Sequence, residues 1–227
     1  MKRRALLAGT LVTAGTSTML PIAWAADERP TTTLAGPDTR GTVPLEQALL
    51  RRRSVREYAP RALSLAFVAQ LLWAAQGTTA SRDRRTAPSA GALYPLELHL
   101  VATRVDGLPP GAHRYRSGPH ALQQTVVEPM ASALAHAAMD QPAVGDAAAV
   151  LVIAAVEART AAKYGARAAR YLAFEAGAAA QNVALQATAL GLASVVVGAF
   201  DDDAVAAALR LAPGGRPIVL LPIGHPR

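Results

Sequence analysis

The sequence contains no cysteine, which excludes disulfides, thiolate metal sites, thiol nucleophiles and a lipoprotein anchor. Aromatic residues amount to 4% of the chain and its arginines are scattered, whereas nucleic-acid binding favours basic residues on one face with aromatics between them. The histidines lack the spacing of metal ligands. No Gly-x-Gly-x-x-Gly or P-loop motif follows a predicted strand, which argues against a Rossmann or P-loop nucleotide site.

Length and apolar content are both ample for a folded domain. The chain has 227 residues, which fits one domain with a leader better than two domains. Apolar residues make up 52% of the sequence, so a sizeable core can be buried without disulfides or metals.

Residues 1–25 have the features of an export leader. They contain no acidic residue, begin with Met1-Lys2-Arg3-Arg4 and end with Ala23-Trp24-Ala25, a small-x-small cleavage pattern. The apolar stretch between them is interrupted and lacks the ~18 continuous apolar residues of a spanning helix. The paired arginines favour a Tat leader, with a Sec signal as the alternative. We therefore expect a periplasmic protein without stable membrane insertion, whose formal charge falls from +7 to +4 when these three basic residues are removed.

Residues 26–43, rich in Thr, Pro and Gly, are interpreted as a linker, and residues 44–227 as one domain. Periodicity, capping residues and apolar runs predict helices at 45–53, 65–75, 128–139, 166–190 and 201–209, and strands at 96–103, 113–116, 121–126, 147–156, 192–197 and 217–223. Strand 96–103 alternates like a half-buried strand, whereas 147–156 is continuously apolar and fits a central one. This order predicts an α+β fold in which helices flank the sheet.

The predicted helix 166–190 carries few polar side chains. Glu175, Asn182 and Gln186 stand at i, i+7 and i+11 and fall within about 20° of one stripe. On a surface helix this stripe would be the solvated face. In a helix at a subunit interface, it would hydrogen-bond to a partner chain or toward a cofactor.

A basic run, Arg51-Arg52-Arg53-Ser54-Val55-Arg56, lies where the first predicted helix ends. A phosphate ester is bound well by two or more planar, permanently charged guanidinium groups with a hydroxyl donor close by. The run supplies both kinds of group. Taken alone, it is also compatible with a solvated face.

Several motifs resemble those of the nitroreductase superfamily, in its SagB-type dehydrogenase branch. From about residue 44 to 226 they follow the order that this branch shows: Arg52-Arg53-Ser54-x-Arg56, Leu71-Leu72-Trp73-Ala74-Ala75-Gln76-Gly77, Arg85-Thr86-Ala87-Pro88-Ser89-Ala90-Gly91-Ala92-Leu93-Tyr94-Pro95-Leu96-Glu97, Lys163-Tyr164-Gly165-x-Arg167, Arg170-Tyr171, Gln181-Asn182, Ala189-Leu190-Gly191-Leu192 and Gly198-Ala199-Phe200-Asp201-Asp202. Each motif is short, but the ordered series is specific. The resemblance implies a nitroreductase-like α+β fold with a mixed, largely antiparallel sheet, an intertwined homodimer, and FMN bound at the dimer interface.

The resemblance assigns the basic run to FMN. Arg52, Arg53 and Ser54 would hold the phosphate and ribityl chain. Arg56 would reach the N1–C2=O edge of the flavin, where two-electron reduction places negative charge that a fixed guanidinium stabilises.

Two further segments would contact the flavin ring. Pro88, Ser89, Ala90 and Gly91 would come from the partner subunit and line the pyrimidine side, where small residues allow close backbone approach. The pair Gly198-Ala199 would lie near N5. A plain strand-to-helix turn, with Asp201 as the N-cap of the next helix, is compatible with the same residues.

Lys163 and Tyr164 match a Lys-Tyr pair of the azoline oxidases in this branch, which aromatise thiazoline and oxazoline rings in modified peptides. There the pair assists proton removal while hydride goes to FMN, and such a dehydrogenation needs a base opposite the flavin. The alternative is that Lys163 is a solvated loop residue and that Tyr164 packs at the start of the next helix.

The expected function is that of an FMN-dependent oxidoreductase that transfers hydride between flavin N5 and a small organic substrate. The alternatives are an azoline oxidase acting on a peptide and a non-catalytic accessory protein with the same fold. Many relatives continue past the position of Arg227 with a basic tail, so FMN affinity is expected to be lower unless Arg227 substitutes for it. Export would separate the enzyme from cytoplasmic NAD(P)H, which leaves its electron donor unknown.

Overall fold

The structure is a computed structural model that describes residues 29–80 and 84–227. The expected leader, residues 1–25, lies outside this part of the chain. No helix in the described ranges is long and apolar enough to span a membrane.

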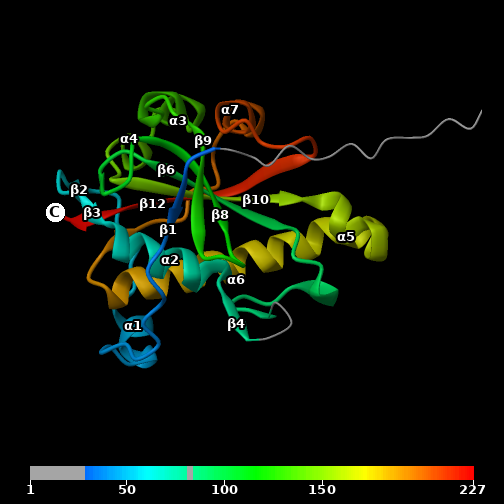
Figure 1. The fold of residues 1–227 in the computed structure, drawn as a ribbon, viewed down its shortest axis with the longest axis horizontal. Helices are drawn as coiled ribbons and strands as arrows, with labels where there is room; N and C mark the ends of the chain where they lie inside the picture. Colours follow the sequence, from blue (N-terminus) through cyan, green and yellow to red (C-terminus); the bar gives the residue numbers. More distant parts are fainter. Residues whose placement is uncertain (1–28, 81–83) are drawn as a thin grey trace, which may run out of the picture.

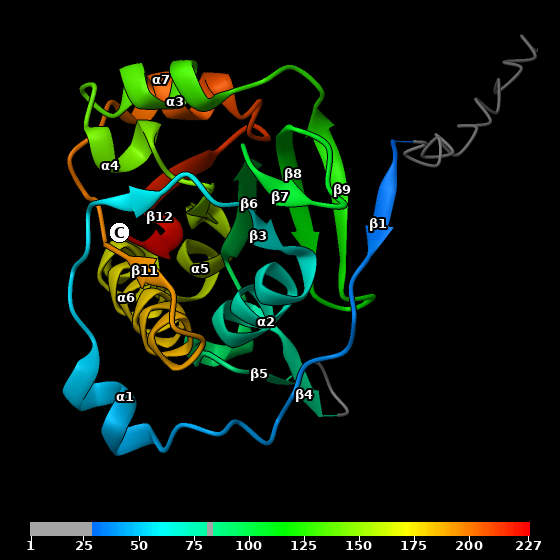
Figure 2. The same ribbon diagram turned by 90° about the vertical axis from the view of Figure 1, so that its left-hand side faces the viewer.

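An antiparallel sheet forms the middle layer of the molecule (Figures 1 and 2). Its strand order is β1-β9-β8-β6-β10-β12-β11, with β2 also paired to β12, and all of these pairs are antiparallel. The strands are β1 (Thr31–Thr33), β2 (Tyr58–Ala59), β6 (Leu96–Ala102), β8 (Gly111–Arg116), β9 (Ala121–Val126), β10 (Ala149–Val156), β11 (Ala193–Ser194) and β12 (Gly215–Pro226). The predicted α+β class with a largely antiparallel sheet is confirmed.

Two small ladders lie outside this sheet. β3 (Leu63–Ser64) pairs in parallel with β7 (Val105–Asp106). β4 (Thr78–Ala80) pairs antiparallel with β5 (Arg84–Arg85).

Helices cover both faces of the sheet (Figure 2). On one face lie α2 (Leu65–Gln76) and α6 (Ala168–Ala189), and on the other α3 (Ala131–Ala137), α4 (Pro142–Gly145) and α7 (Asp202–Ala208). Helix α1 (Leu45–Arg51) contacts α6, and α5 (Glu157–Tyr164) leads into α6 through a 3-10 turn, Gly165–Arg167. Each face of the sheet therefore has its own hydrophobic core.

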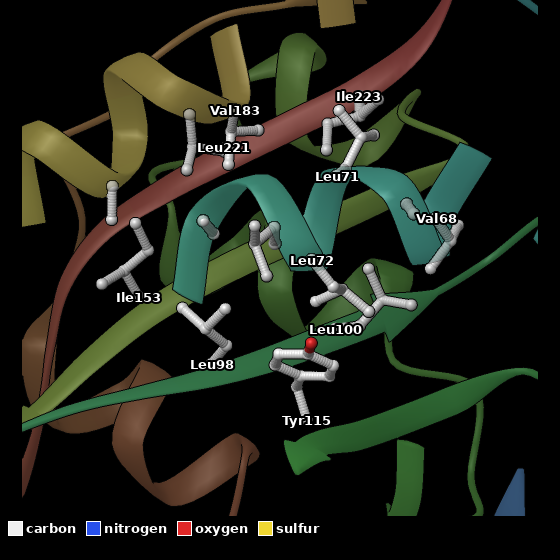
Figure 3. Close-up of a cluster of buried hydrophobic side chains, with 14 of the residues drawn as sticks. Val68, Leu71, Leu72, Leu98, Leu100, Tyr115, Ile153, Val183, Leu221 and Ile223 are labelled. Carbon is white, nitrogen blue, oxygen red and sulfur yellow. The ribbon is translucent and has the colours of Figure 1, made fainter. Parts of the chain in front are cut away.

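The larger core lies between α2, α6 and the sheet (Figure 3). Leu71 and Leu72 of α2 are buried there with Leu98 and Leu100 of β6 and with Ile153 of β10. Full burial of one such side chain contributes about 1.5–3 kcal/mol relative to an exposed one. The helical period of α2 and the alternation of the strands thus position the two layers.

Local capping residues fix the ends of two helices as predicted. The Ser64 hydroxyl accepts a hydrogen bond from the Phe67 N–H at 3.2 Å, and the Asp201 carboxylate accepts one from the Ala204 N–H at 2.9 Å. Gly77 ends α2, and a Cβ at this position would overlap the Trp73 side chain. These bonds satisfy N–H groups that have no partner within the helix.

Some expectations differ from the structure. Strand β6 is buried on both faces rather than half-buried, because it pairs with β8 and β10 between the two helical layers. The expected strand 192–197 is reduced to β11 and an isolated bridge from Val197 to Leu220. Within the expected linker, Thr31–Thr33 pair with β9 as β1, and Leu34 is buried in the larger core.

Helix α5 has no counterpart among the predicted elements. It has Glu157 in its first turn and Lys163 in its last. These charges complement the helix dipole, and they are the signal from which the helix could have been predicted.

Candidate functional site

The basic run forms an extended segment that is fixed by its backbone. The Val55 N–H donates to the Ser194 carbonyl of β11 at 3.0 Å. The Tyr58 hydroxyl donates to the carbonyl oxygens of Val55, at 3.1 Å, and of Pro222 in β12, at 3.3 Å. The run is therefore docked onto the edge of the sheet, next to β11.

The side chains of this run lie at the surface. Arg53, Ser54 and Arg56 are exposed, and Arg52 is partly exposed. One nitrogen of Arg53 donates to the carbonyl oxygens of Leu50, at 2.9 Å, and of Arg52, at 2.8 Å, and so satisfies groups at the C-terminus of α1. The sheet edge thus carries several guanidinium groups and a hydroxyl close together.

Gly198 and Ala199 continue along the same edge. They follow Val197, whose backbone is bonded to Leu220 of β12, and four residues of extended chain from Ser194 to Gly198 span about 13 Å. Both residues are exposed, and a Cβ at Gly198 would meet no described atom within 4 Å. The Ala199 carbonyl accepts from Gln141 Nε2 at 2.7 Å. The structure therefore groups Arg52, Arg53, Ser54, Arg56, Gly198 and Ala199 along one edge, here named the arginine half-site.

Lys163 and Tyr164 lie against Gly91 of the same chain. A Cβ built on Gly91 would be 2.9 Å from the Tyr164 hydroxyl and 3.1 Å from Lys163 Nζ, and the φ of Gly91 is +63°. The positive φ favours glycine here, and a Cβ would displace the ends of the Lys163 and Tyr164 side chains. The Tyr164 ring packs edge-on against Tyr171 at 4.9 Å between centroids. Pro88 to Gly91, Lys163 and Tyr164 are named the lysine half-site.

Lys163 and Tyr164 were expected to be either a proton-transferring pair or a solvated loop lysine beside a packed tyrosine. The structure agrees with part of each expectation. Lys163 is exposed, but it belongs to the last turn of α5 and not to a loop. Tyr164 packs against the start of α6, as the structural alternative required. The two functional groups nevertheless lie at Gly91, where the resemblance places a contact with the flavin.

The polar stripe of α6 contacts other elements of the same chain. Glu175 is 3% exposed, and its carboxylate accepts from the Ala90 N–H at 2.8 Å. Asn182 Nδ2 donates to the Ala74 carbonyl at 3.1 Å and to the Thr86 carbonyl at 3.3 Å. Gln186 Oε1 accepts from Gln70 at 3.3 Å. The stripe fastens α6 to α2 and to the segment that carries Pro88 to Gly91 within one chain.

The basic run of the arginine half-site and the lysine half-site lie at opposite ends of the sheet. Gly198 and Ala199 follow Val197, which is level with the middle of β10 through Leu220 and Val152. The lysine half-site adjoins the start of β6, where Leu96 is paired with Ala155 of β10. The arginine half-site adjoins Ser194, which pairs with Ile223, and Ile223 is itself the partner of Ala149 at the start of β10. Strand β10 has 8 residues, so the basic run and the lysine half-site are about 25 Å apart. The structure brings together Pro88 to Gly91, Lys163 and Tyr164, but it keeps this group apart from the basic run and aligns Gly198 and Ala199 with the basic run only along the edge of the sheet.

Phe174 is absent from the residues named in the sequence analysis, and Tyr171 entered there only as part of the Arg170-Tyr171 motif. Both line a shallow hollow of about 160 Å³ together with Pro88, Ala90 and Glu175. Phe174 is 66% exposed, which is unusual for a large apolar side chain on a buried helix. Phe174 follows Tyr171 by three residues on α6, so the two rings lie about one helical turn apart on the same side. This spacing was the signal by which the sequence could have indicated Phe174.

The comparisons with known proteins agree with this fold. The model of the nitroreductase family matches residues 49–225. A nitroreductase homologue of Methanocaldococcus jannaschii is 41% identical over 183 residues, which cover 81% of this chain and 91% of that protein. The structure of a nitroreductase homologue from Ralstonia eutropha JMP134 has a TM-score of 0.77 and 28% identity, covering 89% of this chain and 92% of the other.

A chain of the Escherichia coli microcin synthetase complex, solved with a truncated pro-MccB17 bound, is also similar. Its TM-score is 0.70 at 25% identity, and the match covers 78% of this chain and 70% of that one. The family match spans most of the sequence and includes both half-sites. The chain belongs to the nitroreductase family of oxidoreductases.

Proposed function

We propose that the protein is an FMN-dependent oxidoreductase of the SagB-type branch that exchanges hydride with a small organic substrate, each flavin being bound between two copies of the chain. The separation of the basic run from the lysine half-site, at opposite ends of β10, carries this proposal. A two-fold axis can set the lysine half-site of one chain against the arginine half-site of its partner. One chain cannot bring its own halves together without losing its sheet.

Exposed apolar side chains support the dimer. Leu45, Leu49 and Leu50 of α1 are 59%, 51% and 65% exposed, and Phe174 of α6 is 66% exposed. Helix α1 leads directly into the arginine half-site, and Phe174 borders the lysine half-site. Burial of such area against a second copy contributes about 25 cal/mol per Å² of apolar surface. The exposed apolar side chains that a second copy would bury therefore lie next to both half-sites.

The residues present fit FMN. Arg52, Arg53 and Ser54 offer surface guanidinium groups and a hydroxyl for the phosphate and ribityl chain, and Arg56 offers a positive charge for the N1–C2=O edge. The open space above Gly198 suits the approach of a flat ring. When bound, FMN supplies the two-electron hydride chemistry of the reaction.

The chain carries two groups suited to proton handling, for a substrate that cannot take its proton from water. Lys163 Nζ and the Tyr164 hydroxyl both lie beside Gly91, so either can hold or accept a proton at the ring face that the lysine half-site covers. The edge contact with Tyr171 orients the Tyr164 ring. The Glu175 carboxylate keeps the backbone of Ala90 in place.

The same pair favours a second candidate function, azoline oxidation of a peptide. The adjacent Lys163 and Tyr164 groups and the similarity to a chain of the microcin synthetase complex support it. A small organic substrate takes precedence because a chain with an export leader would act alone, without a peptide-modifying complex. A non-catalytic accessory protein is the third possibility, and it would purify without the flavin bands near ~370 and ~450 nm.

Mixing two variants tests the shared site. Arg52→Ala with Arg53→Ala removes one half-site, and Gly91→Val blocks the other, because its side chain would strike Tyr164 and the φ is +63°. Each variant alone should lose FMN absorbance. On co-expression about half of the dimers contain both chains, and one site in each of these has two intact halves, so about a quarter of all sites regain FMN. Absence of any recovery would contradict a site built from two chains.

We also propose that the chain is exported in its folded state by the Tat route, on the basis of Arg3-Arg4 and the small-x-small pattern at Ala23 to Ala25. Arg3→Lys with Arg4→Lys should leave the precursor in the cytoplasm, because paired guanidinium recognition is lost while charge is kept. Fractionation and immunoblotting measure this. Unchanged export of the variant would instead indicate a Sec signal.

A further inference from the structure

A cavity lies where two neighbouring strands of the sheet separate. The β6–β8 ladder runs from Ala102 paired with Gly111 to His99 paired with Arg114 and stops there. Beyond it, β6 remains paired with β10 as far as Leu96, and β8 remains paired with β9 as far as Arg116. The gap opens into a cavity of about 390 Å³, a size typical of small-molecule sites.

The walls of this cavity are strongly basic. Arg85, Arg114, Arg116 and Arg159 line it, and Glu97 is the only acidic residue among its described lining residues. Four guanidinium groups therefore face one carboxylate across a small volume. Guanidinium groups are permanently charged and present planar forks that match carboxylate and phosphate oxygens.

Glu97 does not neutralise even its immediate neighbours. Its carboxylate accepts from Arg114 Nη2 at 2.9 Å and from Arg159 Nη2 at 2.5 Å, so one negative charge is shared by two positive ones. Arg85 stacks over the Tyr94 ring, with its guanidinium carbon 4.4 Å from the centroid. These contacts orient the guanidinium groups at the cavity. Arg114, Arg116 and Arg159 together outnumber the single Glu97 carboxylate among the described lining residues.

A buried amide adds a second, independent sign of a ligand. Gln76 lines the cavity at the end of α2 and is 2% exposed. Its Oε1 accepts from Arg85 Nη1 at 3.4 Å, whereas its Nε2 has no hydrogen-bond partner within the described part of the chain. A buried donor left without an acceptor costs about 1–3 kcal/mol. An acceptor in the cavity would remove this cost.

We propose that this cavity is a binding site for a small organic anion, recognised through carboxylate or phosphate oxygens. The guanidinium groups and the Gln76 amide nitrogen are all hydrogen-bond donors. The site therefore favours a ligand that has several acceptor oxygens and no donor groups of its own to satisfy. Arg159 lies four residues before Lys163 on α5, which places the site about one helical turn from the lysine half-site. The site itself does not depend on flavin.

Calorimetric titration tests the proposal, with succinate, citrate, inorganic phosphate and pyrophosphate as probes at constant ionic strength. Arg159→Gln removes one donor and leaves Arg114 to pair with Glu97. Arg216→Gln is the matched control, because this exposed arginine pairs with Asp202 at 3.0 Å away from the cavity. At least one probe should bind the wild type at least ~10-fold more tightly than Arg159→Gln, with no change in Arg216→Gln. The preferred probe then distinguishes a carboxylate ligand from a phosphate ligand.

A second variant separates binding from folding. Gln76→Met keeps the side-chain length but removes the buried amide, so the ligand-free variant should be at least as stable as the wild type while its anion affinity falls. Flavin absorbance is recorded for each sample, so loss of FMN is seen separately. Failure of all four probes to bind at millimolar concentration, or equal weakening in Arg159→Gln and Arg216→Gln, overturns the proposal.

Discussion

In the arginine half-site, backbone hydrogen bonds fix the chain and the side chains project at the surface, whereas in the lysine half-site side chains hold the backbone. The Val55 N–H is bonded to the Ser194 carbonyl, while Arg53 and Arg56 remain exposed. At the other end, the Glu175 carboxylate accepts from the Ala90 N–H.

The lysine half-site has further side-chain supports. The Ser89 hydroxyl accepts from the Tyr94 N–H at 2.9 Å, and the edge contact with Tyr171 positions Tyr164. Substitutions in the arginine half-site should therefore change cofactor binding with little effect on folding. Substitutions that remove these supports in the lysine half-site should disturb its local structure.

The largest effect is expected from Arg52→Ala combined with Arg53→Ala. Loss of charge-assisted hydrogen bonds to the phosphate should weaken FMN binding at least ~10²-fold. The free energy of unfolding should change by about 1 kcal/mol, through loss of the exposed hydrogen bonds from Arg53 to the Leu50 and Arg52 carbonyl oxygens. Equilibrium dialysis and chemical denaturation measure the two effects.

The matched control is Arg210→Ala with Arg216→Ala. It removes the same charge from exposed ion pairs with Glu128 and Asp202 and should keep FMN. Stoichiometric FMN in the Arg52/Arg53 double variant after dialysis would refute the phosphate assignment.

A smaller effect is expected from Lys163→Ala, which tests the chemistry of the lysine half-site. A nitro or quinone substrate can take hydride from flavin N5 and a proton from water, so reduction and reoxidation of bound FMN should change by less than ~10-fold. Tyr164→Phe, which keeps the ring that contacts Tyr171, should retain activity. Rapid-reaction traces of the flavin spectrum give both rates.

The azoline-oxidase alternative makes the opposite prediction for the same variants. General acid–base assistance is typically worth ~10²–10⁴-fold. A hundredfold slower reduction of FMN by substrate in Lys163→Ala, with FMN still bound, would favour that function over reduction of a small molecule.

The smallest effect on either half-site is expected at His99, inside the sheet that separates them. Burial lowers the pKa of His99 to about 4, and neither ring nitrogen has a hydrogen-bond partner among the described residues. The His pKa in the unfolded chain is about 6.5. Between about pH 4 and pH 6.5 the unfolded chain therefore binds a proton at this residue, whereas the folded chain does not. The free energy of unfolding should therefore be constant above about pH 6.5 and fall by about 2 kcal/mol on going to pH 5.

Denaturation of His99→Leu at pH 7.5 and pH 5 tests this. The variant should lose most of this pH dependence, with a residual slope from His113, whose pKa is also lowered by burial. Its FMN content at pH 7.5 should equal that of the wild type, because His99 belongs to neither half-site. An unchanged pH dependence in the variant would contradict the assignment.

Signals that act over a few residues were sufficient for much of the fold, whereas the candidate site residues came from the order of motifs along the chain. Ser64 and Asp201 cap the helices that follow them, and the apolar run of β10 is a central strand. The motif order led to the family that the comparisons show. These features depend on local hydrogen bonding and side-chain periodicity, which the sequence displays directly.

Contacts between distant segments decided the rest. The burial of β6 on both faces depends on which strands and helices become its neighbours. The pairing of Thr31–Thr33 with β9 likewise depends on the open edge of β9, which the local sequence around Thr31–Thr33 does not predict. In the same way, the partners of Glu175 and the meeting of Lys163 with Gly91 arise only when α5, α6 and the segment before β6 pack together. The sequence by itself determined which residues carry charge, hydroxyl or conformational freedom. Only the tertiary structure placed the basic run and the lysine half-site about 25 Å apart at the two ends of β10, because strand pairing and layer packing set those positions.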